Sequence, residues 1–205
     1  FDEVGRVIAA REPNGGTTKA QYDDVGRIAT AYETDAGGDA IPGAGSHADA
    51  ASLAGDAVLL QRNFTYSQST GNLRRIEELR RTHTSSVLGP LSNNDSITRT
   101  IGILYDQADR AKRVVEFGTD GDDNYLSIDT PRVTIARIDA AADVGRNDSA
   151  YDTSLIRDIE YDPVGRRAAT VDPRGLRTEY AYDDASRVIA TIESAAEDPA
   201  DAVPI

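Results

Sequence analysis

A few residues in the chain have types and spacing that could do chemistry. Ser46, His47 and Asp49 are the letters of a hydrolase triad, but they stand within four positions of one another on a glycine-rich segment. Side chains this close in sequence cannot readily adopt triad geometry, so nucleophilic catalysis is not expected there. His83, the other histidine, lies far away in the chain. Two histidines without any cysteine make a poor metal site.

Residues 119–125 have an oxygen-rich composition that is typical of calcium loops. Asp120, Asp122 and Asn124 fall at alternate positions, as at the start of an EF-hand loop. Tyr125 stands where that loop needs glycine, and Pro131 stands where it needs its final glutamate. A polar turn is therefore the favoured interpretation. The three oxygen-bearing residues remain a weak metal candidate, and no cofactor is predicted for the chain.

Three Asn-x-Ser/Thr sequons begin at Asn63, Asn94 and Asn147. They could carry glycans if the protein is exported through a glycosylating pathway. Such tripeptides also arise by chance, so they indicate a surface location only weakly.

The composition excludes several classes of partner and fold. The formal net charge of -13 makes nucleic acid an unsuitable partner, because phosphate binding needs a concentrated positive surface. Cysteine is absent, so disulfides and thiolate metal sites are excluded. No apolar run approaches the ~18 residues that a membrane span needs. Hydrophobic residues make up 39%, much of it alanine, which favours a sheet stabilised by neighbouring strands over a self-sufficient core.

A repeat organises the elements that position these residues. Four heptads open with an aromatic residue followed by aspartate, at residues 1–7, 22–28, 161–167 and 182–188. Degenerate copies begin at Tyr66 and Tyr105. The first two heptads start 21 residues apart, and so do the last two. A fixed period of this kind indicates a repeat architecture.

The last complete unit predicts the structure of one repeat. Asp162 to Gly165 and Asp172 to Gly175 both read Asp-Pro-x-Gly. In that pattern the Asp side chain caps backbone donors, Pro presets φ, and Gly accepts a positive φ. Residues 166–171 and 176–182 lie beside these turns and are rich in Thr, Val, Tyr and Arg, as strands of ordinary length are. The sequence therefore predicts an all-β antiparallel meander.

The repeated Asp–Arg pairs could suggest an active site. Asp23 with Arg27 recurs in the later units, and each pair is preceded by an aromatic residue. Recurrence at every turn favours packing instead, because equivalent residues of a meander form ladders. Opposite charges facing each other across strands contribute about 0.2–1 kcal/mol per pair. The aromatic residues are predicted to form a packing ladder in the same way.

The whole pattern resembles the YD repeat of RHS and teneurin-like proteins. The second copy contributes Tyr22, Asp23, Gly26 and Arg27, and the fullest copy contributes Tyr161, Asp162, Gly165, Arg166, Asp172, Gly175, Thr178, Tyr180, Tyr182, Asp183 and Arg187. The resemblance implies a β-strand that spirals into a hollow shell. In bacterial members such shells commonly enclose a toxic C-terminal domain, and in teneurin-like members they form an extracellular adhesion scaffold. The chain departs from the pattern in its long insertions and in lacking the terminal Asp-Pro-x-Gly-rich plug.

The chain is predicted to be a single YD-repeat region, residues 1–205, that forms part of a longer protein. Regular repeats are expected at 1–35 and 157–194, and insertions at about 36–57, 82–96 and 118–150. Residues 36–57 are small and flexible in type, which favours a surface loop. Residues 73–81 could form a short helix with charges at i,i+3 and i,i+4, but the repeat places a strand there, and the strand is favoured.

Three functional hypotheses follow. The first is a structural β-sheet scaffold of a secreted or cell-surface protein, which encloses cargo such as a toxin domain or forms an extracellular assembly. The second is an adhesion module in which the inserted loops bind carbohydrate or a receptor. An enzyme is not expected. The predicted partners are neighbouring repeats or identical copies, an enclosed toxin domain or a cell-surface glycan, with no nucleic acid and no membrane span.

Overall fold

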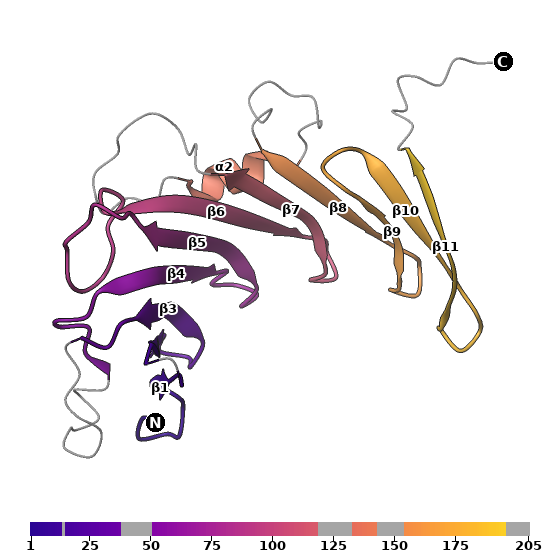
Figure 1. Ribbon diagram of the computed structural model, residues 1–205. Helices are drawn as coiled ribbons and strands as arrows, with labels where there is room; N and C mark the ends of the chain where they lie inside the picture. Colours follow the sequence, from indigo (N-terminus) through magenta and orange to yellow (C-terminus); the bar gives the residue numbers. More distant parts are fainter. Residues whose placement is uncertain (14, 38–50, 119–132, 143–153, 196–205) are drawn as a thin grey trace. The chain divides into compact units, whose positions relative to one another are not determined.

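A computed structural model describes residues 1–13, 15–37, 51–118, 133–142 and 154–195. Within them, eleven strands follow one another as neighbours in sequence order, from β1 to β11, accompanied by a short helix (Figure 1). The predicted all-β meander is confirmed. The chain divides into two compact units, Phe1–Ile101 with Gly118–Ile135, and Gly102–Phe117 with Ala136–Ile205. We call these the first and the second unit.

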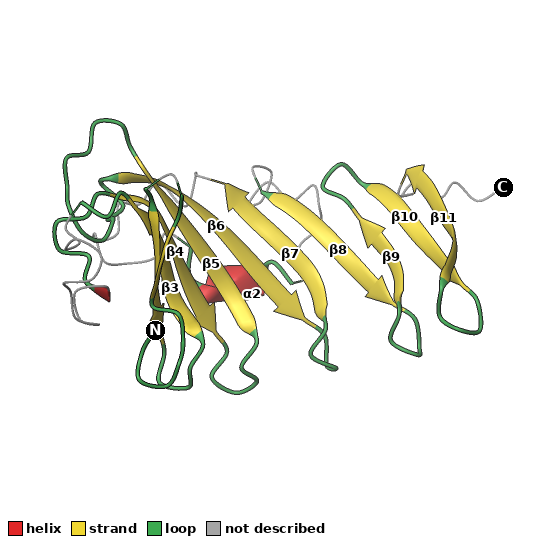
Figure 2. Ribbon diagram, turned by 60° about the horizontal axis from the view of Figure 1, so that its bottom comes forward, coloured by secondary structure: helices red, strands yellow, loops and turns green. Residues whose placement is uncertain are grey.

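The first unit contains five strands and the beginning of a sixth. These are β1 (Ala9–Arg11), β2 (Thr17–Tyr22), β3 (Ile28–Thr34), β4 (Val58–Tyr66), β5 (Leu73–Arg81) and the start of β6 (Ser96–Tyr105). The first five pair antiparallel with their sequence neighbours (Figure 2). Residues 73–81 therefore form the favoured strand rather than a helix, because their side chains alternate between a covered and an open face.

One face of the first unit is covered by loops. Its buried cluster consists of Tyr32, Val58 and Leu79 from the strands and Leu53 and Leu91 from the connecting segments. The strands offer few large apolar side chains, so loop residues complete the core. The predicted surface loop 36–57 is described at 36–37 and 51–57, and its second part packs onto the sheet through the buried side chains of Leu53 and Asp56.

The second unit contains the rest of β6 together with β7 (Ala111–Gly118), β8 (Leu155–Tyr161), β9 (Arg167–Val171), β10 (Leu176–Tyr182) and β11 (Val188–Ala195). Strands β7 to β11 pair antiparallel in sequence order. Strands β9 and β10, with their two turns, make up the predicted repeat of two strands.

A short helix, α2 (Ile135–Ala140), packs against β6. Ile138 is fully buried, and a Cβ atom added to Gly102 would stand 2.8 Å from its side-chain carbons. The glycine thus lets the helix approach the sheet closely. The helix falls in the predicted insertion 118–150, where no helix was expected. Among the described residues, no helix is long and apolar enough to cross a membrane.

Candidate functional site

The repeated Asp-x-x-Gly-Arg turn is the most regular feature of the molecule. In the second copy, Asp23 N donates to Arg27 O at 2.8 Å, and Gly26 N donates to Asp23 O at 2.9 Å. Asp23 Oδ1 accepts from Val25 N and Arg27 N, while Oδ2 accepts from Arg27 Nε at 2.7 Å. Gly26 has a φ of +88°, the left-handed conformation that the turn predicted. The turns led by Asp2, Asp106, Asp162 and Asp183 repeat these contacts.

These bonds hold the turn carboxylates in the charged state. Hydrogen bonds from the side chain and backbone of Arg110 lower the pKa of Asp106. Partial burial would raise the pKa of Asp23, but hydrogen bonds from the backbone and side chain of Arg27 outweigh it, and this pKa is lowered as well. Each aspartate is thus committed to closing its own turn.

The turn arginine also reaches the next tyrosine of the ladder. The Arg27 guanidinium lies 4.3 Å from the centroid of the Tyr66 ring, and Tyr66 Oη donates to Ile28 O at 2.9 Å. The arginine therefore joins a carboxylate on one side and an aromatic face on the other.

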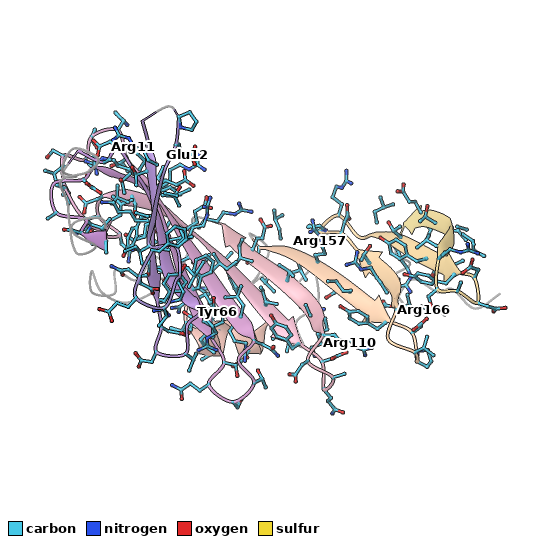
Figure 3. The ribbon with its side chains drawn as sticks, turned by 90° about the horizontal axis from the view of Figure 1, so that it is seen from below. Arg11, Glu12, Tyr66, Arg110, Arg157 and Arg166 are labelled. Atoms are coloured by element: carbon cyan, nitrogen blue, oxygen red, sulfur yellow. The ribbon has the colours of Figure 1, made fainter. Side chains whose placement is uncertain are left out.

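Three further turns have the same arrangement. The guanidiniums of Arg6, Arg110 and Arg166 lie 4.4, 4.3 and 4.6 Å from the ring centroids of Tyr22, Tyr161 and Tyr182. The hydroxyls of these tyrosines donate to the carbonyls of Val7, Ala111 and Arg167 at 2.8, 3.0 and 2.9 Å. In every case the acceptor is the residue after the stacked arginine. Arg110 and Arg166 lie at the turn ends of their hairpins (Figure 3).

A change of strand register marks the same tyrosines. The pairing shifts between Gln21 and Tyr22, between Thr65 and Tyr66, between Glu160 and Tyr161, and between Ala181 and Tyr182. A bulge re-aims the side chain of the strand that carries it. Each of these four bulges coincides with a tyrosine that covers the preceding arginine, whereas the shift between Glu33 and Thr34 involves no tyrosine.

The structure corrects the predicted charge ladder. The Asp–Arg pairs close within a single turn, at 2.6–2.7 Å between Nε and Oδ2 in the turns of Asp2, Asp23 and Asp162. They do not face each other across strands, because a four-residue spacing in a tight turn already brings both groups together. Cross-strand ion pairs occur elsewhere: Arg62 contacts Glu33 and Glu78, and Arg177 contacts Glu160.

Several predicted repeat residues lie outside the stack. Asp172 closes the turn before β10 by accepting from Leu176 N, and Gly175 there has a φ of +85°. Thr178 lies within β10 opposite Thr170. The hydroxyls of Tyr180 and Thr170 are 3.4 Å apart. These residues hold the hairpin of β9 and β10 together.

The chemically suggestive residues of the insertions are mostly outside the described residues. This holds for Ser46, His47, Asp49, Asp120, Asp122, Asn124 and Asn147. Asn94 is exposed in the loop before β6. Asn63 lies within β4, accepts from Gln61 Nε2 at 3.0 Å and hydrogen-bonds Glu77. Glycosylation stays a prediction, although the hydrogen-bonded Asn63 amide is a poor position for a glycan.

Sequence reasoning missed a buried ion pair in the first unit. Lys19 Nζ lies 2.8 Å from Asp56 Oδ2, and both side chains are almost completely buried. Lys19 Nζ also donates to Ser52 O at 2.6 Å. The only sequence signal was a lysine that follows two threonines in a strand, and nothing local pointed to a partner 37 residues away.

A second set of buried polar side chains lies on β5. Arg75 Nη1 donates to Val133 O and Nη2 donates to Thr65 Oγ1, both at 3.0 Å. Arg75 also lies 3.6 Å from Glu77. Burial raises the pKa of Glu77, against the opposing effect of Arg75 and of a hydrogen bond with Asn63. These contacts anchor the segment that leads into α2.

Each stacked arginine and tyrosine therefore connects a turn to the end of a neighbouring strand, and we call such a pair an Arg–Tyr joint. The carboxylates, guanidiniums and phenols of the repeated motif all contact one another or the backbone of the sheet. Within the described ranges, no group of three His, Asp or Glu side chains could hold a metal ion. Fold and motif together define a repeat β-sheet protein.

The family comparison agrees with this class. The RHS Repeat family model matches residues 1–40 and 161–197, and these two stretches are RHS repeats. No curated protein matches the chain.

Three solved structures resemble the chain at low similarity. The crystal structure of TcdB2-TccC3-Cdc42 has a TM-score of 0.39 and 12% sequence identity, and the match covers 93% of this chain. The Tc holotoxin pore of Photorhabdus luminescens has a TM-score of 0.30 and 11% identity over 97% of this chain. The crystal structure of TcdB2-TccC3-TEV has a TM-score of 0.30 and 13% identity over 96% of this chain. The match spans only 8–10% of the length of those chains.

Proposed function

We propose that the chain is a structural β-sheet scaffold segment of a larger RHS-repeat protein. The observation that carries the proposal is the Arg–Tyr joint, which recurs at four turns with the same stacking distance and the same hydroxyl-to-carbonyl hydrogen bond. A catalytic or binding site needs polar groups that remain available to a ligand. In this motif the polar groups are engaged by the sheet itself.

The repetition also explains how the sheet is stabilised with so few large apolar residues. A cation–π contact contributes about 0.5–1 kcal/mol at an exposed site, and a hydrogen bond contributes about 1 kcal/mol. Each joint is modest, but the contributions accumulate from one repeat to the next. The proposal therefore assigns the repeat motif to architecture and assigns no catalysis to it.

The wider setting is part of the proposal. We place the full protein outside the cell or at its surface, where the sheet encloses cargo such as a toxin domain or contributes to an extracellular assembly. The RHS repeats at both ends of the chain support this setting, since shells and adhesion scaffolds are the structures that the family resemblance implies.

The test is the behaviour of residues 1–205 in isolation. A wall segment has edges that pair with further strands, so we expect self-association in light scattering coupled to size-exclusion chromatography, and thermal unfolding that is broad by circular dichroism. A monomer with one sharp, cooperative transition would contradict the proposal, because it would identify a self-sufficient domain.

A further inference from the structure

We infer that the turn of Asp183–Arg187 and the outer edge of β11 form an acceptor for one more repeat strand, which must end in a tyrosine. The inference rests on the proposed scaffold function and specifies the partner chemistry of one edge.

The first observation is the exposure of Arg187. The four arginines that lie over a tyrosine have side chains 31–36% exposed. Arg187 holds its own turn aspartate in the same way, with Nε donating to Asp183 Oδ2 at 2.7 Å. Its side chain is nevertheless 79% exposed. The guanidinium is thus positioned by its carboxylate as in the other turns, with an uncovered face where they have a tyrosine ring.

The second observation is the surface of β11 itself. Among the described strands, β11 pairs with β10 alone. Val188, Ile189 and Ile192 are 52–66% exposed. An uncovered strand with apolar side chains is a template for a further strand. This edge continues the antiparallel ladder already formed by β8, β9, β10 and β11.

The existing joints specify the occupant. In each joint, the strand after the arginine is paired with a strand that ends in tyrosine, and the tyrosine hydroxyl donates to the residue after the arginine. By the same rule, the incoming tyrosine would cover Arg187 and donate to Val188 O. The turn after the incoming tyrosine can vary, since the joint of Arg166 with Tyr182 has Ser186 where the joint of Arg110 with Tyr161 has Gly165. The acceptor therefore selects a strand that ends in tyrosine.

A peptide of residues 155–166 from this chain is a suitable probe, since it contains β8, Tyr161 and Gly165. Binding to the 1–205 chain is measured by fluorescence anisotropy, by the mode in which a strand is added to a sheet edge. We expect measurable binding that Arg187→Ala weakens about 2- to 5-fold, the range of one exposed cation–π contact. Arg187→Lys, which keeps the charge but not the planar stack, should also weaken it.

Arg174→Ala is the matched control. The Arg174 side chain is 81% exposed and contacts Asp172 at 2.9 Å, so it resembles Arg187 in exposure and pairing but lies outside the ladder. It should leave peptide affinity unchanged. Tyr161→Ala in the peptide should weaken binding to the wild-type chain more than binding to the Arg187→Ala chain, because the stack is already absent there and only the hydroxyl contact with Val188 O remains to be lost. Circular dichroism verifies that the variants are folded.

Two results would overturn the inference. One is peptide binding that is absent or unaffected by Arg187→Ala and Arg187→Lys. The other is self-association that Arg187→Ala abolishes while the peptide does not bind, which would assign the edge to a second copy. The scaffold proposal fails on a different result, a cooperative monomer, so the two failures are distinguishable.

Discussion

At the scale of single residues, the turns depend on one backbone position that must have a positive φ. Gly5, Gly26 and Gly165 occupy it with φ between +85° and +91°, whereas Asp109 and Ser186 adopt +58° and +61°. A side chain in this region costs about 1–2 kcal/mol, since Cβ approaches the following carbonyl oxygen. Ser186, like Asp109, is therefore strained at a position that glycine occupies in the other turns.

The substitution Ser186→Gly should stabilise the chain. Relief of the Cβ clash is partly offset by the larger backbone entropy of glycine in the unfolded state, so we expect a gain of about 0.5 kcal/mol. The reverse change at an equivalent turn, Gly165→Ser, should destabilise. Urea titrations followed by circular dichroism measure both, and a loss of stability in Ser186→Gly would contradict the account of the turn.

The turn aspartates make the free energy of unfolding depend on pH in the acid range. The pKa of Asp23 is lowered in the folded chain because the Arg27 hydrogen bonds outweigh the effect of partial burial. Its contribution is therefore present above the unfolded pKa of about 3.9. That contribution is lost as the pH falls through the lower folded value.

We expect Asp23→Asn to flatten the acid limb of the unfolding free energy plotted against pH. Asp24→Asn, at the exposed neighbouring position, removes the same charge without a turn hydrogen bond and serves as control. Urea titrations between about pH 2 and 7 measure the slope. Equal acid limbs in the two variants would show that the turn carboxylate is not what the acid disrupts.

At the scale of elements, the joint between β3 and β4 can be measured directly. Arg27 stacks on Tyr66, and these residues are 39 positions apart. A double-mutant cycle with Arg27→Ala and Tyr66→Leu should give a coupling of about 0.5–1 kcal/mol in the free energy of unfolding. Arg80→Ala combined with Tyr66→Leu is the control, since Arg80 contacts Glu78. If the losses of unfolding free energy in the two single variants simply added in the double variant, the stack of Arg27 on Tyr66 would not stabilise the chain.

The close packing of helix α2 on β6 depends on the absence of a Cβ atom at Gly102. A Cβ at position 102 would stand 2.8 Å from two carbons of Ile138, which is fully buried. Gly102→Ala should therefore destabilise by about 1–3 kcal/mol through overpacking. Ile138→Ala in the same chain should recover part of the loss by making room, although alone it leaves a cavity. Thermal unfolding of the single and double variants tests this, and the absence of any recovery would contradict direct contact.

At the scale of the molecule, the Lys19–Asp56 pair decides how an inserted segment covers the sheet of the first unit. Both charges are buried, so removal of one leaves the other uncompensated. Lys19→Met should cost about 3–5 kcal/mol. The double variant Lys19→Met with Asp56→Leu should be much less damaging, because no charge remains buried. Urea unfolding compares them. A double variant as unstable as the single one would show that packing, not charge, determines the loss.

The sequence predicted local structure well because local chemistry determines it. Asp162-Pro-x-Gly165 specifies a turn whatever surrounds it, and the strands beside it follow from their composition and length. The sequence also showed that Asp and Arg recur together. The predicted contact across strands was wrong, because the same residues can form either a cross-strand ladder or an ion pair within one turn. The helix Ile135–Ala140 was not predicted, since six residues carry too little periodicity to reveal it.

By itself, then, the sequence determined the repeat, its turns and the all-β class, since these depend on contacts only a few residues apart. The tertiary structure alone decided which tyrosine covers which arginine and where Lys19 finds its carboxylate. Those partners are separated by connecting segments of different lengths, from Arg166 with Tyr182 to Arg110 with Tyr161. Only the pairing and bulges of the strands fix such contacts, because they set which side chains meet in space.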